Sequence, residues 1–537
     1  MANRTLNELL TFIERHANLQ IMQKSGSLSG QVKLNQMTQD SRDVSSGDVF
    51  IALQGEQVHG LRFLADVLQQ GAAVIIADRP LRASEKALLE QIDHDVMVLA
   101  LQNIQTMQGD LAAWFYGYPS QSLKVIGITG TNGKTSCAFY CAQLLHAQQQ
   151  KVAIIGTLGN GVFNGEMLLH ALQKTRNTTP NAVALQQLLA EFVALGVEWC
   201  VMEVSSHAIC LGRIQGVHFC ATALTQVTRD HMDFHPTLKH YQQTKMQLFR
   251  DYHSDAKIIN SEDEIGRELL TELLDLQKDE QQDQWSVWAY GEHCLISGLP
   301  DLWLDNMHLC SYQLLALNEQ GMQARFSTRK SIDDSNLTVN IPLIGRFNIE
   351  NVSCSLAILL SQGFALADLL ASCGQLQAVM GRMQIVSQQP SVILDFAHTP
   401  DALQQVLIAS RHHLEKEAKL WVVFGCGGDR DRGKRPLMAE VAAEYADKVM
   451  VTSDNPRSEE PQWIIDEIMT GFDTAQKTSV MQQVDRTEAI QQVLSLAAEH
   501  DLVVIAGKGH EDYQEIKGER QPYSDFDAVQ QWLHSKR

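Results

Sequence analysis

The sequence predicts an α/β protein of three domains, with parallel sheets in the second and third. Short apolar, β-branched runs alternate with longer amphipathic runs along the 537 residues, a pattern typical of strands joined by helices. Such alternation favours parallel sheets with right-handed crossovers. At about 150 residues per domain the length corresponds to three or four domains. Hydrophobic residues make up 45% of the chain, enough for several cores. We place the domains at 1–120, 121–386 and 387–537.

The first domain is predicted to be a small α/β unit. Helices are expected at Leu61–Gln70 and Asn103–Phe115, where apolar residues follow a helical spacing. Apolar runs predict strands at Asp48–Leu53, Ala72–Ala77 and Val96–Leu101. The turn-forming residues Gly117-Tyr-Pro-Ser120 end the pattern and mark the first boundary.

The second domain opens with an apolar strand, Leu123–Thr129, that runs into a glycine-rich turn. Further strands are expected at Lys151–Gly156, Trp199–Val204, Ala221–Thr225 and Ala256–Asn260. The charged stretch Gln277–Gln284 is predicted to lie on the surface. The region Leu295–Thr338 shows only weak β-like alternation, and we interpret it as an insertion.

The third domain begins near Gln388 and has the most regular pattern. Its expected strands and helices are Ser391–Phe396, Asp401–His412, Leu420–Phe424, Pro436–Tyr445, Lys448–Thr452, Pro461–Gly471, Thr487–His500 and Leu502–Ala506. Ligands of parallel sheets bind at the carboxyl ends of the strands. Three polar loops follow strands there, Cys426–Arg432, Ser453–Arg457 and Gly507–Glu511, and we expect them to form a ligand site.

Composition excludes several classes of function. The 43 basic and 63 acidic residues give a net charge of −20, which disfavours nucleic acid and anionic membranes as partners. A phosphorylated small ligand remains compatible, because one site can be basic in an acidic protein. No uncharged apolar run is long enough to span a membrane, and the first residues lack a signal-peptide pattern. The ten cysteines are scattered without a CxxC pair, which favours reduced thiols in a cytoplasmic protein.

A phosphate-binding loop is the strongest single motif. Gly127-Ile-Thr-Gly130-Thr-Asn-Gly133-Lys134-Thr135 follows a predicted strand and precedes a predicted helix, as a P-loop must. Backbone amides and the helix start would hold the phosphates, Lys134 would reach the β/γ phosphates, and the Thr135 hydroxyl would bind Mg²⁺. The glycine spacing differs from the standard GxxxxGK[ST], since Ile128 occupies the first glycine position. The motif indicates that the protein binds ATP or GTP. The alternative is a glycine-rich turn in which the sequence Gly-Lys-Thr occurs by chance.

The string Gly130-Thr-Asn-Gly-Lys-Thr135 resembles the ATP loop of the Mur ligases, the amide-forming enzymes of peptidoglycan precursor synthesis. Other strings resemble the same family in order along nearly the whole chain. They are Asp40-Ser-Arg42, Asn177-Thr-Thr179, Glu203-Val-Ser-Ser-His207, Arg229-Asp-His231, Gly345-Arg-Phe-Asn348, Gly381-Arg-Met383 and Asp395-Phe-Ala-His-Thr-Pro400. The resemblance implies an N-terminal domain that binds the UDP-substrate, a central ATP-binding P-loop domain and a Rossmann-like C-terminal domain that binds the amino acid.

Within the family, three C-terminal strings resemble the branch that adds the third amino acid of the stem peptide. They are Gly427-Gly-Asp-Arg430, Asp454-Asn-Pro-Arg457 and Gly507-Lys-Gly-His-Glu511. This implies an ATP-dependent ligase that adds meso-diaminopimelate to UDP-N-acetylmuramoyl-L-alanyl-D-glutamate through an acyl phosphate, with Mg²⁺, as a cytoplasmic monomer. An arginine can hold the distal carboxylate of diaminopimelate, which L-lysine lacks, so Arg457 argues against the lysine-adding type.

The resemblance also implies roles for individual residues. The ATP set is Gly130, Thr131, Asn132, Gly133, Lys134, Thr135, Ser136, Asn348, Arg382 and Asp395. The catalytic residues are Lys134, Glu203, His231 and Lys245; Thr135, Glu203 and His231 hold the metal, and Lys245 is carbamylated to N6-carboxylysine. The UDP-muramoyl-dipeptide set is Ser41, Gln57, Asn177, Thr178, Thr179, Ser205 and Arg213. The diaminopimelate set is Arg430, Asp454, Asn455, Pro456, Arg457, Gly507 and Glu511.

Residue by residue, simpler interpretations stand beside these roles. Glu203 could be a solvated strand end, His231 a structural histidine, Lys245 an exposed helical lysine and Arg457 a surface arginine. The amine also requires a general base, for which His207 is one candidate. Three positions depart from the family pattern: Leu211 replaces a polar Gln, Gln226 an Asn and Phe396 the more common Tyr.

Three other functions remain open from sequence. The first is the L-lysine-adding ligase. The second is a P-loop phosphotransferase or nucleotide switch, which would not need Arg430, Arg457 and Glu511 on its C-terminal loops. The third is a non-catalytic nucleotide-binding protein, against which the presence of Lys134, Glu203 and Lys245 argues.

Overall fold

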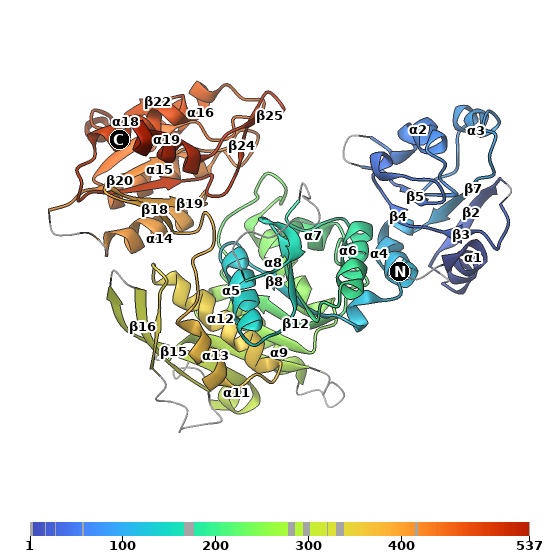
Figure 1. Cartoon of the computed structure of the whole chain (residues 1–537), viewed down its shortest axis with the longest axis horizontal. Coiled ribbons are helices and arrows are strands. Elements are labelled where there is room, and N and C mark those ends of the chain that lie inside the picture. Colours follow the sequence, from blue (N-terminus) through green and yellow to red (C-terminus); the bar gives the residue numbers. More distant parts are fainter. Residues whose placement is uncertain are drawn as a thin grey trace.

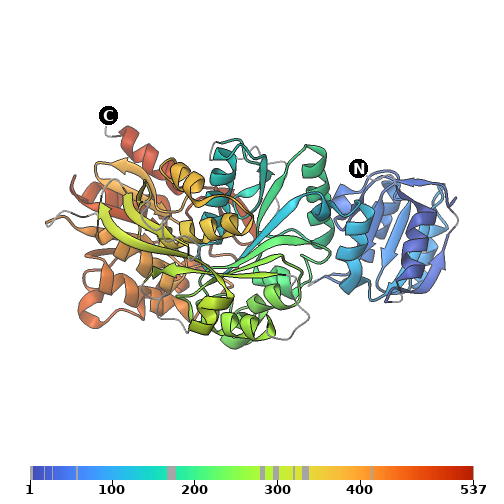
Figure 2. The same ribbon diagram turned by 90° about the horizontal axis from the view of Figure 1, so that it is seen from below.

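Three α/β units lie in a row in the computed structural model, with the N-terminal unit at one end and the C-terminal unit at the other (Figure 1). The structure describes residues 4–16, 18–26, 28–55, 58–165, 177–277, 285–293, 301–318, 321–328, 338–412, 414 and 417–535. Seen at right angles, the N-terminal unit stands apart while the other two lie against each other (Figure 2). The predicted three-domain α/β fold is confirmed; the boundary positions stay a prediction.

The N-terminal unit is built on a five-stranded sheet in the order β2-β7-β6-β5-β4. β5 and β6 are buried along their whole length, as expected of parallel strands covered on both faces. The strands are β2 (Gln20–Ser25), β4 (Met37–Thr38), β5 (Val49–Ala52), β6 (Val74–Ala77) and β7 (Met97–Gln102), with β1 (Arg4–Thr5) paired to β3 (Lys33–Leu34). The helices are α1 (Leu6–Arg15), α2 (Leu64–Gln69), α3 (Ala83–Leu89) and α4 (Ile104–Phe115), with 3₁₀ turns at Ser41–Asp43, Gly60–Phe63 and Pro119–Gln121.

The central unit contains a ten-stranded sheet in the order β10-β9-β11-β8-β12-β13-β14-β15-β16-β17. Its first strands are β8 (Lys124–Thr129), β9 (Val152–Gly156), β10 (Gly159–Val162), β11 (Trp199–Glu203), β12 (Phe219–Leu224), β13 (Ala256–Asn260) and β14 (Ser286–Glu292). One face packs against α5 (Lys134–Ala147), α12 (Phe347–Ser361) and α13 (Leu366–Cys373). The other packs against α6 (Ala182–Ala194), α7 (Ser206–Cys210), α8 (Leu238–Arg250) and α9 (Glu264–Gln277).

The interpretation of Leu295–Thr338 as an insertion is wrong for its described part. After α11 (Asp301–Asn306), the strands β15 (His308–Asn318), β16 (Gly321–Ser327) and β17 (Thr338–Ile341) extend the central sheet. Alternate residues of β16, among them Met322, Ala324 and Phe326, are buried in the core beneath α12. A strand buried on one face gives only a short alternating pattern, which is a weak sequence signal. Residues 278–284 of the predicted surface stretch lie outside the described residues.

The C-terminal unit has a six-stranded sheet in the order β18-β19-β23-β20-β21-β22, parallel apart from β18. The strands are β18 (Gln384–Gln388), β19 (Ser391–Asp395), β20 (Leu420–Phe424), β21 (Lys448–Thr452), β22 (Met481–Gln483) and β23 (Leu502–Ala506), followed by a hairpin of β24 (Tyr513–Ile516) and β25 (Glu519–Pro522). The helices are α14 (Pro400–Arg411), α15 (Lys434–Tyr445), α16 (Pro461–Met469), α17 (Thr474–Lys477), α18 (Arg486–Leu496) and α19 (Asp525–Ser535). All four predicted strands are present.

Strand register sets the position of the candidate site. Glu203 pairs with Ile128 and Leu224 pairs with Thr129, so β11, β8 and β12 end side by side at one edge of the central sheet. The loops that leave these ends therefore converge. Among the described residues, no helix combines the length and apolar composition needed to cross a bilayer.

Candidate active site

The glycine-rich loop between β8 and α5 is held close to the strand beside it. Gly130 and Gly133 have φ angles of +149° and +86°, which non-glycine residues rarely adopt. A Cβ atom on Gly130 would lie 1.8 Å from Oγ1 of Thr225, so only glycine fits there. The Thr225 hydroxyl donates to the carbonyl of Asn132 (2.6 Å), which fixes the loop to the end of β12. The predicted strand–loop–helix context of the P-loop is thus present.

Lys134 begins α5 and folds back over the loop. Its Nζ donates to the carbonyls of Gly130 and Thr131 at 2.8 and 2.9 Å. Burial lowers the pKa of Lys134, with Glu203 and Asp230 opposing this shift. The amine therefore sits at the mouth of the loop, where the phosphates of a nucleotide would lie.

Glu203, at the end of β11, is buried and not a solvated strand end (1% exposed). It accepts hydrogen bonds from the hydroxyl of Thr135 (3.0 Å) and from the backbone and hydroxyl of Thr157 (2.9 and 3.1 Å). A Cβ on Gly156 would lie 2.3 Å from Oε1 of Glu203, so the backbone of β9 approaches the carboxylate closely. These hard oxygen atoms fit the coordination preference of Mg²⁺.

Lys245 is also buried, contrary to the simple interpretation of an exposed helical lysine (2% exposed). It lies on α8, and its Nζ donates to the carbonyl of Gly130 (2.8 Å) and stands 4.7 Å from the ring centre of Tyr241. Burial and the neighbouring Lys134 lower its pKa well below the usual range, although Asp230 opposes this. A lysine must lose its proton before it can react with CO₂, so this environment favours carbamylation.

His231 lies on the loop after β12, beside Asp230. Its Nε2 is 3.4 Å from the Asp230 carboxylate, and its ring meets the His207 ring edge-on at 4.9 Å. Burial, together with nearby cationic groups, lowers the pKa of His231 to about 3. Its imidazole is therefore neutral near pH 7, as a metal ligand must be.

Arg382 lies between α13 and β18, where the chain passes from the central to the C-terminal unit, and Asp395 is the last residue of β19. The Arg382 guanidinium donates to the Thr135 hydroxyl (3.3 Å) and stacks on the Phe396 ring at 4.4 Å. Asp395 accepts from the backbone amides of Met383 and Ala397 at 2.8 and 2.7 Å. Since the contact to Arg382 uses only the ring face, the Phe at position 396 preserves it without a hydroxyl.

One pocket joins these parts, and it encloses about 260 Å³. Lys134 and Arg382 bring positive charge to it, Lys245 adds an amine of lowered pKa, and Glu203 and Asp230 bring negative charge. Two members of the predicted ATP set, Gly130 and Asn348, do not line the pocket. The Gly130 carbonyl accepts from Lys134 and Lys245, and the Asn348 amide is hydrogen-bonded to Ile344 and Tyr140. The predicted residues that line the pocket are Thr131, Asn132, Gly133, Lys134, Thr135, Ser136, Thr178, Glu203, Ser205, His231, Lys245, Arg382 and Asp395.

The residues predicted to bind the UDP-substrate are divided between two regions. Thr179 donates to the Glu203 carbonyl (2.8 Å), and Arg213 donates to the Thr179 carbonyl (3.1 Å), so both lie just beyond the pocket residues Thr178 and Ser205. Asn177 precedes them on the same segment. Ser41 is in the N-terminal unit, in the 3₁₀ turn after β4. Gln57 lies outside the described residues.

The diaminopimelate set lies on the loops that follow β20, β21 and β23, as predicted. The side chain of Asn455 donates to Glu511 (2.8 Å), and the Arg457 guanidinium donates to the Gly428 carbonyl (2.7 Å). Gly507 (φ +113°) bonds through its amide to the Asp395 carbonyl (3.0 Å), which links this cluster to the pocket. The remaining members, Arg430, Asp454 and Pro456, lie on the same loops.

Lys508 is a member of this cluster that the sequence analysis missed. Its side chain is completely buried, and its Nζ lies 2.8 Å from Glu511 and 3.5 Å from Asp454. Lys508 and Arg486 hold the pKa of Asp454 below its usual range, although burial alone would raise it. The sequence analysis placed the motif Gly507–Glu511 in the ligand site but gave Lys508 no role. A lysine between two glycines carries no local pattern that shows it to be buried.

Polar contacts hold the C-terminal unit over the pocket. Asn132 of the phosphate loop donates to Asp401 at the start of α14 (3.1 Å). Arg430 forms an ion pair with Asp233 of the central unit (3.2 Å). These contacts, like the one between Arg382 and Thr135, join residues 197 to 269 positions apart in sequence.

Comparison with known proteins agrees with this geometry. Three family models match: the Mur ligase family catalytic domain at residues 33–116, the Mur ligase middle domain at 128–359 and the Mur ligase glutamate ligase domain at 381–509. The chain belongs to the Mur ligase family. The predicted resemblance, and with it the prediction of an ATP-dependent amide ligase, is confirmed.

Individual relatives cover almost the whole chain. A UDP-N-acetylmuramoyl-L-alanyl-D-glutamate–2,6-diaminopimelate ligase of Haemophilus influenzae (strain PittGG) is 38% identical over 94% of this chain and 97% of its own. A solved structure of a ligase with the same name is 30% identical, with a TM-score of 0.62 over 100% of this chain and 99% of its own. The MurF ligase of Thermotoga maritima in complex with ADP is 17% identical (TM-score 0.61, over 93% of this chain and 97% of its own) and shares the fold.

Proposed function

We propose that this Mur ligase joins meso-diaminopimelate to the terminal carboxylate of UDP-N-acetylmuramoyl-L-alanyl-D-glutamate and consumes ATP in doing so. The observation that carries the proposal is the single pocket in which the phosphate loop, Glu203, Lys245 and Arg382 meet. The relatives named as 2,6-diaminopimelate ligases support the choice of substrates. We assign the reaction to the cytoplasm and to a monomer.

Thr135, Glu203 and His231 are the proposed Mg²⁺ ligands, and a carbamylated Lys245 would add a carboxylate nearby. Two of these three side chains offer oxygen and the third a neutral imidazole, which suits a hard divalent cation. When bound, Mg²⁺ supplies positive charge against the phosphate oxygens.

Two basic side chains of the protein would also stabilise the negative charge of the phosphate groups. Lys134 and Arg382 line the pocket and would stabilise negative charge on the transferred phosphoryl group. The substrate carboxylate takes the γ-phosphoryl group of ATP and releases ADP, which gives an acyl phosphate. The amine then attacks the carbonyl carbon, a C–N bond forms, and the C–O bond to phosphate breaks. The amine must arrive deprotonated, and His207 stays a candidate base.

The other predicted residues would bind the two substrates that the reaction joins. Thr178, Ser205 and Arg213, with Asn177, Thr179, Ser41 and Gln57, would bind the UDP-muramoyl-dipeptide. Arg430 and Arg457 would hold carboxylates of diaminopimelate, and Glu511 its distal ammonium. L-Lysine has no second carboxylate, so it would lack the charged contact with one of these arginines and bind much more weakly.

The contacts between Asn132 and Asp401 and between Arg430 and Asp233 support a closed arrangement during the reaction. Closure would keep water away from the acyl phosphate.

Incubation of the purified protein with ATP, Mg²⁺, the UDP-muramoyl-dipeptide and either diamino acid tests the proposal. We expect phosphate release together with a UDP-muramoyl-tripeptide, detected by mass, with diaminopimelate only. Equal rates with L-lysine would refute the argument from Arg457. Phosphate release without a peptide product would indicate a phosphotransferase or nucleotide switch, and no turnover at all a nucleotide-binding protein.

A further inference from the structure

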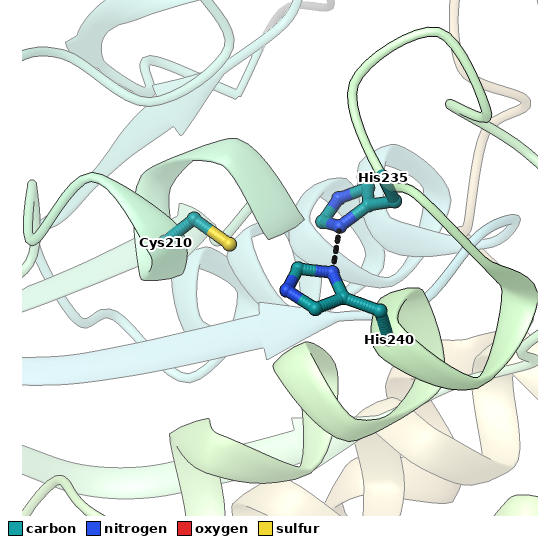
Figure 3. Close-up of side chains that lie close together, drawn as sticks. All are labelled: Cys210, His235 and His240. Carbon is teal, nitrogen blue, oxygen red and sulfur yellow. Dashed lines mark hydrogen bonds between the residues drawn. The ribbon is translucent and has the colours of Figure 1, made fainter.

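A group of three metal-binding side chains lies beside the active site and takes no part in the proposed reaction. Cys210, His235 and His240 each offer one ligand atom, and these atoms lie within 4.8 Å of one another. They come from three segments: the end of α7, the loop after β12 and the first turn of α8. Figure 3 shows the three side chains pointing toward a common centre.

The two imidazoles lie in direct contact. Nδ1 of His235 and Nδ1 of His240 are hydrogen-bonded to each other at 3.0 Å, so a metal ion bound by both nitrogens replaces this hydrogen bond. The other nitrogen of His235 lies 2.9 Å from the Ser206 hydroxyl. A hydrogen bond on the far nitrogen orients a ligating histidine and fixes its tautomer. In the tautomer in which Nε2 carries the proton and donates to Ser206, the lone pair of Nδ1 is available to a metal ion.

The distances and spacing suit Zn²⁺. Tetrahedral zinc, with bonds of about 2.0–2.3 Å, places its ligand atoms about 3.3–3.8 Å apart. The ligand atoms of the three residues lie up to 4.8 Å apart, so some must move closer to reach the zinc distances. Cys210 and His240 are exposed and can move, whereas His235 is buried. The interval His235-x₄-His240 falls within the H-x₃₋₅-H spacing of zinc sites.

Room for a fourth ligand exists next to Cys210 and His240. Both line a polar cavity of about 390 Å³, together with Gln243, Thr244 and Arg250. Arg250 is paired with Glu272 (2.6 Å), so its charge is already balanced. A water molecule in this cavity can complete a tetrahedron.

We propose that Cys210, His235 and His240 form a binding site for one Zn²⁺ ion, with water as the fourth ligand. Zinc in this position ties α7 to α8, the helices that carry Ser206 and Lys245 to the pocket. The site differs in chemistry from the proposed Mg²⁺ site, because a thiolate and imidazoles select zinc over magnesium.

Cobalt absorption tests the site without depending on activity. The full-length protein, reduced and in excess Mg²⁺, is titrated with Co²⁺, and a thiolate-to-cobalt charge-transfer band is recorded. Cys210 is the exposed cysteine among those the structure describes. We expect a band that saturates at one equivalent and disappears when Zn²⁺ is added.

Variants decide which residues bind. Cys210→Ser should abolish the band, and His240→Asn should weaken Zn²⁺ binding by more than about tenfold in competition with a chromophoric chelator. Both positions are exposed, so unchanged thermal stability in the presence of a chelator is expected and shows that the variants fold. His253→Asn alters an exposed residue of the separate group His218, His253 and Asp255 and serves as the matched control. Cobalt binding without a thiolate band, or equal zinc affinity in Cys210→Ser and the unmodified protein, would overturn the proposal.

Discussion

Replacing Lys508 with methionine removes the cation at the centre of the C-terminal loops. Its ammonium group is completely buried and lies 2.8 Å from Glu511, 3.5 Å from Asp454 and 3.1 Å from the Asn455 amide oxygen. Methionine preserves much of the volume of the side chain but leaves both carboxylates without this partner. We therefore expect a loss of stability and a loss of amino-acid binding.

The size of the effect follows from these distances. At an effective dielectric constant of about 20, the two attractions amount to roughly 6 and 5 kcal/mol before the cost of desolvating the charges. Removing one partner of a buried ion pair typically costs about 3–5 kcal/mol net, because the other charge stays buried. For a domain of this size, that corresponds to a fall in Tm on the order of 10 °C.

Calorimetry and steady-state kinetics measure the two consequences separately. Lys508→Met should lower the Tm of the C-terminal unit and raise the KM for diaminopimelate, with the KM for ATP little changed. Adding Glu511→Gln should recover part of the Tm, because it removes one unpaired carboxylate, but should not recover the KM. Lys477→Met, at an exposed position on α17, is the control. A variant with unchanged Tm and unchanged KM would refute this reasoning.

Three further changes test other parts of the molecule. Arg457→Ala should raise the KM for diaminopimelate about 10–100-fold, as expected for a lost charged hydrogen bond, and Arg457→Lys should not restore it; a selective loss of ATP affinity would count against this role. Lys245→Ala should nearly abolish turnover and regain part of it with short carboxylic acids, whereas the exposed Lys239→Ala on the same helix should stay active; full activity of Lys245→Ala would remove it from the site. The buried Arg435 lowers the pKa of Glu459 to about 2 from 4.5, so this pair stabilises the protein fully above pH 4.5 and loses its effect as the pH falls toward 2. Thermal unfolding of Glu459→Gln should therefore depend less on pH between 5 and 2, and an unchanged slope would contradict the assignment.

Local patterns in the sequence were sufficient for the buried parallel strands of the C-terminal unit. Four of these strands, β19, β20, β21 and β23, are five-residue, mostly apolar runs, and they appear where the pattern predicts them. The phosphate loop was equally clear, since glycines, a lysine and a threonine follow a buried strand. By contrast, β16 and β17 belong to an antiparallel extension and are only partly buried, and their alternating pattern was too weak to separate from irregular structure.

The amino-acid order thus determined the class of fold, the phosphate loop and the family to which the chain belongs, because these depend on residues that are close neighbours in sequence. Tertiary structure alone decided that Lys245 is buried against Gly130, that Arg382 reaches Thr135 across the unit boundary, and that Lys508 lies between two carboxylates. Burial and charge pairing arise when distant segments pack together. A lysine on a helix or between two glycines has the same local sequence whether water or protein surrounds it.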